Sequence, residues 1–317
     1  MSSEHPVLAQ VERSGFVEGE HRGSVVVLGV DGQVSYAAGD VDAPMFPRSS
    51  NKPLQAVGMV RLGLDLPDQL LALVTASHSG ETVHFDGVAA ILSTVGLDVT
   101  ALQTPESEPL GEIALRQWIG DHMAPQRIAG NCSGKHAGMI VTAALNGWDI
   151  ATYLDPEHPL QRSLRTTFES LTATPVEAVG IDGCGAPVLS TSLRALAGAF
   201  RGLALADPGS PERRVADAMR AWPWMVGGSE GRDVTDHMLK IDGLLMKDGA
   251  EGVVGAALAD GRAFALKVDD GAVRAREVVT ASILRSLGCR GSSVDRYGET
   301  VLLGGGQPVG AVRAVLP

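Results

Sequence analysis

One serine and one lysine of this chain stand at a spacing that a serine hydrolase could use. Ser49 and Lys52 form a Ser-x-x-Lys pair, and Pro53 follows at a position that a helix accepts only in its first turn. We therefore expect the pair at the start of a helix, with both side chains on the same side. A hydroxyl group there lies near the positive end of the helix dipole, and a neutral amine one turn later can take its proton.

The small number of lysines and their positions in the chain support a catalytic role for this pair. Only five of the 26 basic side chains are lysines, and arginine, unlike a buried lysine, cannot lose its proton. A nucleotide composition that favours arginine codons would give the same ratio, and a serine cap followed by a solvated lysine would give the same pair. Ser77 and the Lys247-Asp248-Gly249 turn, however, follow in the order used by penicillin-recognising serine hydrolases. This order favours an enzyme.

A second group of residues has the chemistry of metal ligands. Cys132, Lys135 and His136 share one glycine-bearing segment, and Asp182 and Cys184 share another. Zinc takes thiolate and nitrogen ligands of this kind in a tetrahedral arrangement. The spacing matches no standard zinc signature, so two buried cysteines that act as small hydrophobic residues are the alternative. With only three cysteines, the chain is not expected to contain a disulfide framework.

The elements that must position these residues divide into strands at both ends of the chain and helices in the middle. Alternating or β-branched runs predict strands over 7–12, 24–30, 33–38, 252–259 and 262–268, with Asp31-Gly32 and Asp260-Gly261 as hairpin turns. Apolar residues at helical spacing predict helices over 53–63, 85–95, 137–146, 160–171 and 189–200. We expect an α+β fold of the α/β sandwich type, in which helices cover one antiparallel sheet formed by both termini, with a helical lobe and a cleft beside it. A single domain over 1–317 is the simplest organisation.

Composition restricts the class of protein. The formal net charge of −11 opposes binding to nucleic acid, and no run of about 18 apolar residues is present to cross a membrane. The first thirty residues lack the basic start and apolar core of a signal peptide. We therefore expect a cytoplasmic protein with a small-molecule substrate.

Five segments together resemble the asparaginase II family, the third, rhizobial-type class of bacterial L-asparaginases. They are Arg48-Ser49-Ser50-Asn51-Lys52-Pro53, Ala76-Ser77-His78-Ser79-Gly80-Glu81, Asn131-Cys132-Ser133-Gly134-Lys135-His136-Ala137-Gly138, Asp182-Gly183-Cys184-Gly185-Ala186-Pro187 and Lys247-Asp248-Gly249-Ala250-Glu251-Gly252. The likeness runs from the first strand almost to the last. It implies a fold similar to serine β-lactamases and serine-dependent glutaminases, a homodimer, and hydrolysis of L-asparagine to aspartate and ammonia.

The resemblance also implies roles for individual residues. Two Ser and Lys tandems map onto Ser49 with Lys52 and onto Ser77 with a later lysine, for which Lys247 fits by its setting and Lys267 is the rival. A zinc cofactor is implied on Cys132, Lys135 and Cys184, with His136 and Asp182 close by, which replaces the reading of the cysteines as hydrophobic residues.

Arg48 and Arg232 are candidates to hold the substrate carboxylate through paired hydrogen bonds, and with His136 and Asp182 they form the predicted substrate-binding set. A substrate anchored at its charged end should favour asparagine over glutamine. Two alternatives remain: a glutaminase or other amide or lactam hydrolase on the same scaffold, and a non-catalytic zinc or amino-acid binding protein.

Overall fold

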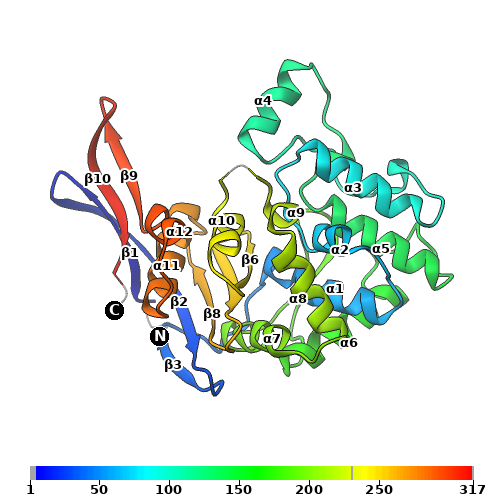
Figure 1. Ribbon diagram of the computed structural model, residues 1–317, viewed down its shortest axis with the longest axis horizontal. Helices are drawn as coiled ribbons and strands as arrows, with labels where there is room; N and C mark the ends of the chain where they lie inside the picture. Colours follow the sequence, from blue (N-terminus) through cyan, green and yellow to red (C-terminus); the bar gives the residue numbers. More distant parts are fainter. Residues whose placement is uncertain (1–4, 230, 316–317) are drawn as a thin grey trace. The chain divides into compact units, whose positions relative to one another are not determined.

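The computed structural model describes residues 5–229 and 231–315 and divides into two compact units (Figure 1). Unit 1 contains residues 1–50, 191–205 and 236–317, and unit 2 contains residues 51–190 and 206–235. Residues 1–4, 230, 316 and 317, which belong to the predicted domain 1–317, lie outside the described residues. The single catalytic domain therefore stays a prediction.

Unit 1 is built on an eight-stranded antiparallel sheet to which both ends of the chain contribute. The strand order is β6-β7-β8-β2-β1-β10-β9, and β3 pairs with β2. The strands are β1 Val7–Arg13, β2 Phe16–Leu28, β3 Val34–Ala38, β6 Leu245–Gly249, β7 Val253–Ala257, β8 Ala263–Val268, β9 Glu299–Gly304 and β10 Gln307–Ala314. The α+β class and the terminal sheet are confirmed.

Both predicted hairpins form at their Asp-Gly turns. Gly32, between β2 and β3, has a φ of +82°, and Gly261, between β7 and β8, has a φ of +89°. Positive φ is the conformation that tight hairpin turns require and that glycine adopts without strain. Because the turn residues are local signals, these strands could be predicted from the sequence alone.

Helices α7 (Leu193–Leu205) and α11 (Val273–Ser286) pack on this sheet, and the short α12 (Ser292–Arg296) follows α11. The predicted helix over 189–200 begins too early, because residues 187–189 form strand β5 and Thr191 bridges to Met45. Because the backbone of residues 187–191 pairs with β4 and with Met45, the helix starts only at Leu193. Periodicity within one segment cannot reveal such a partner.

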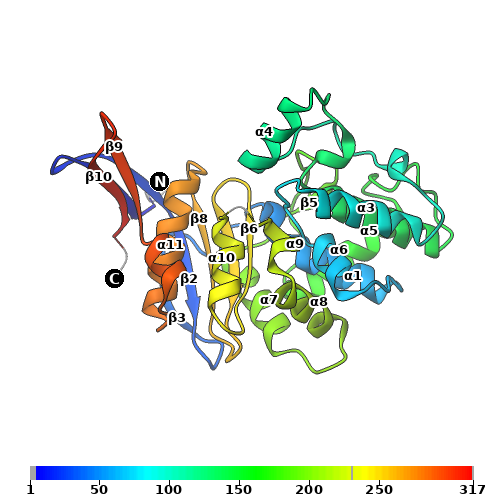
Figure 2. The same cartoon turned by 45° about the horizontal axis from the view of Figure 1, so that its top comes forward.

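Unit 2 is mainly helical (Figure 2). Its helices are α1 Lys52–Arg61, α2 Asp68–Val74, α3 Thr82–Ser93, α4 Glu112–Gly120, α5 Ser133–Leu145, α6 Pro159–Thr172, α8 Pro211–Ala221 and α9 Pro223–Gly227, and its small hairpin consists of β4 Val179–Ile181 and β5 Pro187–Leu189. Short 3-10 helices occur at η1 Arg48–Asn51, η2 Val99–Ala101 and η3 Arg127–Ala129, and α10 (Asp233–Lys240) runs across the boundary between the units. The helices predicted at 53–63, 85–95, 137–146 and 160–171 correspond to α1, α3, α5 and α6.

Helix α5 lies at the centre of unit 2, with α1, α2, α3 and α6 against it. Its residues are almost all buried, which fits a helix covered on every side. Two glycines allow the close approach of α2: a Cβ at Gly134 would lie 2.3 Å from the carbonyl oxygen of Leu73, and one at Gly138 would lie 2.9 Å from Val74. The packing thus fixes the start of α5, where the cysteine and lysine motif stands.

Within the part of the chain that the structure describes, no helix combines the length and the apolar composition that a membrane crossing needs.

Candidate active site

The predicted site residues belong to both units, and each unit carries its own cluster. Unit 1 holds Arg48, Ser49 and Lys247, and unit 2 holds Lys52, Ser77, Cys132, Lys135, His136, Asp182, Cys184 and Arg232. The boundary between the units falls inside the Ser-x-x-Lys motif, after Ser50. The 3-10 helix η1 leads directly into α1, so the motif begins a helix, and Pro53 occupies its first turn as predicted.

The turn that carries Ser49 has an unusual backbone. Arg48 has a φ of +52°, in the left-handed region that residues with a side chain seldom adopt. Gly249, the last residue of β6, packs on this turn: a Cβ there would lie 2.4 Å from the carbonyl oxygen of Pro47 and 3.3 Å from the amide nitrogen of Ser49. The serine turn and the strand end therefore meet backbone to backbone, which only a glycine permits. Ser49 is half-buried, and its hydroxyl makes no hydrogen bond to the described residues of its unit.

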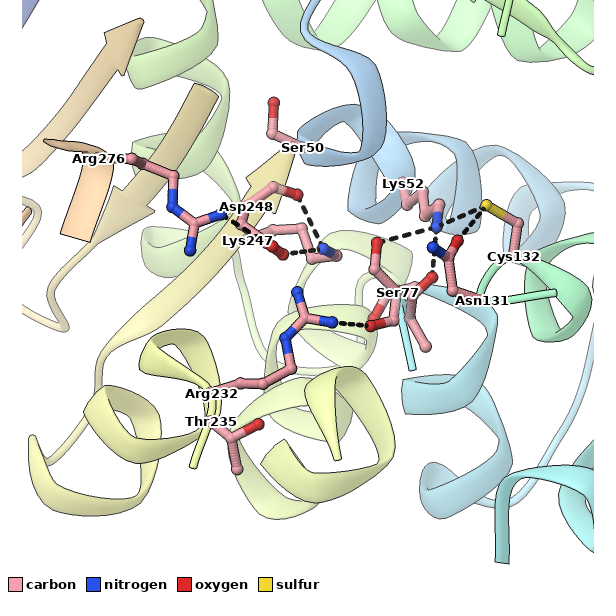
Figure 3. Close-up of polar contacts among 12 residues, drawn as sticks. Ser50, Lys52, Ser77, Asn131, Cys132, Arg232, Thr235, Lys247, Asp248 and Arg276 are labelled. Carbon is pink, nitrogen blue, oxygen red and sulfur yellow. Dashed lines mark hydrogen bonds and ion pairs between the residues drawn. The ribbon is translucent and has the colours of Figure 1, made fainter. Parts of the chain in front are cut away.

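Lys247 belongs to a buried chain of charges in unit 1 (Figure 3). Its Nζ donates to the carbonyl oxygen of Asp248 at 2.8 Å and forms an ion pair with the carboxylate of the same residue. The other carboxylate oxygen accepts from Nη1 of Arg276 on α11 at 3.2 Å. All three side chains are nearly inaccessible, so Asp248 balances charge that would otherwise be buried unpaired.

Lys267, the rival of Lys247, has a different setting in unit 1. It lies on β8 and is half-buried, and its Nζ donates to the carbonyl oxygen of Glu251 at 2.9 Å. Burial lowers the pKa of Lys267, and the Glu251 carboxylate opposes this shift. The same carboxylate lies 3.7 Å from the guanidinium of Arg48. Which lysine serves Ser77, and whether Arg48 binds substrate, stay predictions.

Lys52, in unit 2, is completely buried, with none of its surface exposed. Its Nζ donates to the Ser77 hydroxyl at 3.1 Å, to the Cys132 sulphur at 3.2 Å and to the carbonyl oxygen of Ala76 (Figure 3). The alternative of a serine cap followed by a solvated lysine is therefore excluded. The contact with Ser77 also joins the lysine of the first predicted tandem to the serine of the second.

Ser77 sits in the loop after α2, and a second loop of unit 2 holds it in place. Arg232 donates through Nη1 to the backbone oxygen of Ser77 at 2.7 Å (Figure 3). Glu81 accepts from the Ser79 hydroxyl at 2.6 Å, and from the backbone N–H and hydroxyl of Ser229 at 2.7 and 2.9 Å. We call these contacts, which join segment 77–81 to Ser229 and Arg232, the clasp.

Sequence reasoning named Arg232 only as a substrate ligand and gave Glu81 no role, because the clasp joins segments about 150 residues apart. Desolvation raises the pKa of the Glu81 carboxyl, but the hydrogen bonds from Ser79 and Ser229 outweigh it, so the pKa is lowered. Glu81 is therefore a carboxylate at neutral pH and can accept all three bonds.

His78 follows Ser77 and faces the interior of unit 2. Its Nε2 lies 2.9 Å from the Ser133 hydroxyl, and its ring stacks on that of His84 with 4.9 Å between the centroids. The pKa of His78 lies well below its ordinary value, mainly because the ring is buried and also because positively charged groups are near. Burial also lowers the pKa of His84. Two neutral imidazoles thus connect the Ser77 loop, α3 and the start of α5.

The two cysteines and Lys135 meet in one buried pocket, which we call the cysteine pocket. Lys135 donates through Nζ to the Cys184 sulphur at 3.2 Å. The pKa of Cys132 lies well below its usual range because of its hydrogen bond with Cys184 and because Lys52 and Lys135 are near, although burial opposes the shift. Burial lowers the pKa of Lys135, but the two sulphurs outweigh it and the pKa is raised. The lowered pKa of the Cys132 thiol and the raised pKa of the Lys135 ammonium group share a cause, because each charged group favours the ionised form of the other.

Asp182 and His136 stand next to this pocket in different ways. Asp182 begins the turn between β4 and β5 that presents Cys184, is partly exposed, and accepts from the Gly183 N–H at 2.8 Å. Its charge contributes to raising the pKa of Lys135.

His136 is fully buried on α5, and its Nδ1 lies 2.6 Å from the hydroxyl of Tyr153. Burial, helped by the charge of Lys135, lowers the pKa of His136 to about 4. Tyr153 carried no motif and was missed.

The donor chemistry of the pocket suits zinc, but the described residues do not by themselves form a standard metal site. Two thiol groups and an amine are the ligands that the sequence implied, and soft sulphur ligands select zinc over magnesium or calcium. No group of three or more His, Cys, Asp and Glu side chains is arranged to hold a metal among the described residues. The zinc therefore stays a prediction that depends on Lys135 as the third ligand.

Three of the solved structures that match this chain have low sequence identities to it and TM-scores below 0.5. A protein named Mglu, in its tris and glutamate form, is 12% identical over 90% of this chain and 63% of its own, with a TM-score of 0.47. A β-lactamase from Mycobacterium bovis is 16% identical over 83% of this chain and 94% of its own, with a TM-score of 0.45. A Bacillus glutaminase is 13% identical over 84% and 91%, with a TM-score of 0.39. This chain thus spans less than two thirds of the length of Mglu.

The comparison with curated protein sequences finds no match. The family model described as L-asparaginase II, in contrast, matches residues 9–314, which is nearly the whole sequence and includes all the clusters described above. The chain therefore belongs to the L-asparaginase II family.

Proposed function

We propose that the protein hydrolyses L-asparagine to aspartate and ammonia, with Ser49 as nucleophile and Lys52 as general base. The family supports an amidohydrolase, and one observation of the structure supports the chemistry. Lys52 is completely buried, and its amine is within hydrogen-bond distance of a second hydroxyl group, that of Ser77. A buried amine that contacts a hydroxyl is suited to move protons, whereas a structural lysine would gain more from exposure to water.

The proposed reaction has two halves. Neutral Lys52 accepts the proton of the Ser49 hydroxyl while the serine oxygen attacks the carbon of the side-chain amide. The tetrahedral oxyanion is stabilised by backbone N–H groups, among which that of Ser49, beside the close contact with Gly249, is our candidate. Collapse of this intermediate leaves an acyl-enzyme and releases the amine, and water then cleaves the ester to give aspartate and free Ser49.

Ser77 and Lys247 assist the proton transfers in this proposal. The Ser77 hydroxyl, which accepts from Lys52, passes the proton from Lys52 to the departing ammonia. Lys247 supplies positive charge that favours the neutral form of Lys52. Asp248, whose carboxylate is itself bonded to Arg276, holds the Lys247 side chain in a fixed orientation for this role.

We also propose zinc as a cofactor of the cysteine pocket, held by Cys132, Lys135 and Cys184. When bound, zinc would supply a positive charge that anchors the α-amino or α-carboxylate end of the substrate. Purified protein should then carry about one zinc per chain, and replacement of Cys132 and Cys184 together by alanine should remove it. Metal content can be measured by mass spectrometry, and an unchanged content in the double variant would contradict the assignment.

Substrate selectivity follows from anchoring at the charged end. Arg48, Arg232, His136 and Asp182 are the proposed contacts for the α-amino and α-carboxylate groups. With these groups fixed, the extra methylene of glutamine displaces its amide by about one bond, and a misplacement of about 1 Å can cost about a hundredfold in rate. The ratio of kcat/KM for asparagine and glutamine measures this, and a ratio near one would favour a glutaminase.

The proposal is tested by ammonia release from purified protein with asparagine, glutamine and a chromogenic lactam. Activity with asparagine that disappears in Ser49→Ala supports a serine amidohydrolase. Activity that persists in this variant would exclude Ser49 as nucleophile, and no activity on any of the three substrates would favour a binding protein. Sedimentation analysis of the same sample tests the homodimer that the family resemblance implies.

A further inference from the structure

Tyr153 is the largest fully buried side chain in the described part of the chain, and its hydroxyl faces a single imidazole. The hydroxyl lies 2.6 Å from Nδ1 of His136, and the two rings meet edge to face with 5.7 Å between their centroids. His136 belongs to α5 and Tyr153 to the segment that follows this helix, and both lie in unit 2. Because both side chains are buried and their polar atoms are in close contact, the rings of Tyr153 and His136 are held in fixed positions.

The direction of this hydrogen bond can be derived from what else the tyrosine contacts. Among the described residues, the Tyr153 hydroxyl makes its hydrogen bond with His136. Burial raises the pKa of this hydroxyl, so it keeps its proton, and the backbone N–H of Gln103 interacts with its oxygen. If Nδ1 of His136 donated to this oxygen, the tyrosine proton would be buried without an acceptor, at a cost of about 1–3 kcal/mol. Tyr153 therefore donates and Nδ1 accepts.

This direction determines which nitrogen of His136 carries hydrogen. In a neutral imidazole one ring nitrogen accepts and the other donates, so a hydrogen bond received at Nδ1 leaves the proton on Nε2. Nε2 is buried and has no well-directed hydrogen bond to a described residue, while the Cys184 side chain interacts with the same imidazole. A ring nitrogen that carries hydrogen has no lone pair for a metal.

We propose that Tyr153 is a positioning residue that holds His136 in the tautomer with its proton on Nε2, so that His136 offers the cysteine pocket a hydrogen-bond donor and not a metal ligand. The donor stabilises an anionic end of a substrate that reaches the cysteine pocket. The effect on substrate rests on the proposed function, but the tautomer does not.

The first test is NMR spectroscopy of the protein with 15N-labelled histidine at neutral pH. The chain has eight histidines, and the spectrum of His136→Gln identifies the resonances of His136. The proposal expects Nε2 to resonate as a protonated ring nitrogen and Nδ1 as an unprotonated one. The opposite assignment, or loss of the Nε2 proton when zinc is added, would overturn it, whether or not the protein hydrolyses an amide.

The second test removes the hydroxyl alone. Tyr153→Phe should release Nδ1, so that the spectrum changes toward a mixture of the two tautomers, and KM for the amide substrate should rise about tenfold while kcat changes little. Tyr36→Phe, on β3 of unit 1, is the matched control and should change neither. An unchanged tautomer in Tyr153→Phe would contradict the role of Tyr153.

The third test distinguishes a donor from a metal ligand by substitution at His136 itself. His136→Gln can place an N–H group where Nε2 stands, whereas His136→Glu places only oxygen atoms there. The proposal expects His136→Gln to keep its zinc content and to raise KM for the substrate less than His136→Glu does. Equal loss of zinc in both variants would show that His136 is a ligand and overturn the proposal.

Discussion

The serine turn of unit 1 and the cysteine pocket of unit 2 are built by different means. The turn is shaped by backbone atoms, with Gly249 packed on it and Arg48 in a left-handed conformation. The pocket is shaped by side chains, where Lys52, Lys135 and two sulphurs are buried together. The serine turn should therefore be sensitive to any atom added at the backbone contact. The cysteine pocket should be sensitive to any change in the charge of its side chains. Mutations should therefore affect the two regions through different properties.

The largest expected effect is on charge and proton transfer in unit 2. Lys52→Arg keeps the positive charge and a side chain of similar size, but an arginine cannot become a neutral base. We therefore expect kcat to fall by about 10² to 10⁴. Steady-state ammonia release measures the loss, and Lys240→Arg on the exposed end of α10 is the control that should remain active. Substantial activity in Lys52→Arg would make Lys52 a structural cation.

A methyl group should be nearly as damaging in unit 1. Gly249→Ala places a Cβ in contact with the carbonyl oxygen of Pro47, so the serine turn must shift, and a shift of about 1 Å should lower kcat/KM by about a hundredfold. Gly198→Ala, on α7 of the same unit with open space around it, should have normal activity. If both variants were equally active, the serine turn would not depend on this contact.

A smaller effect is expected from the clasp. Glu81→Gln keeps the shape of the side chain but loses the charge that accepts three hydrogen bonds, so the free energy of unfolding should fall by about 1–3 kcal/mol. Because the Ser77 loop is held by Arg232 as well, kcat should fall less than in Lys52→Arg. Urea denaturation and ammonia release measure the two effects, and Glu108→Gln serves as the surface control. A loss of activity without a loss of stability would point to direct chemistry by Glu81.

The smallest expected effect is a pH dependence of stability from the stacked histidines. The pKa values of His78 and His84 are lowered in the folded state from an ordinary value of 6.5. The unfolded chain therefore binds protons first as the pH falls, so stability is complete above about 6.5 and declines below it. The urea midpoint should decrease from pH 7.5 to pH 5.5. His84→Gln should reduce this slope and exposed His122→Gln should not, and equal slopes in all three proteins would exclude the pair as the cause.

Local signals account for what the sequence could predict. The Asp-Gly turns and Pro53 fix neighbouring backbone, so the hairpins and the start of α1 were predicted correctly. The contact of Lys52 with Ser77 and the clasp of Glu81 depend on how distant segments pack, and no spacing encodes them. Tyr153 was missed for the same reason. The Ser-x-x-Lys motif revealed which residues could react but not which hydroxyl group each lysine would contact.

The two glycines of α5 have a consequence for protein engineering. Replacing a helical glycine by alanine usually stabilises a protein by about 0.4–1 kcal/mol, because the unfolded chain loses freedom. At Gly134 and Gly138 the same replacement would push α2 away from α5, so a stability screen based on helix propensity would fail there. Gly198 and Gly202 on α7 have no atom within 4 Å of an added Cβ and are the positions where such a screen should succeed.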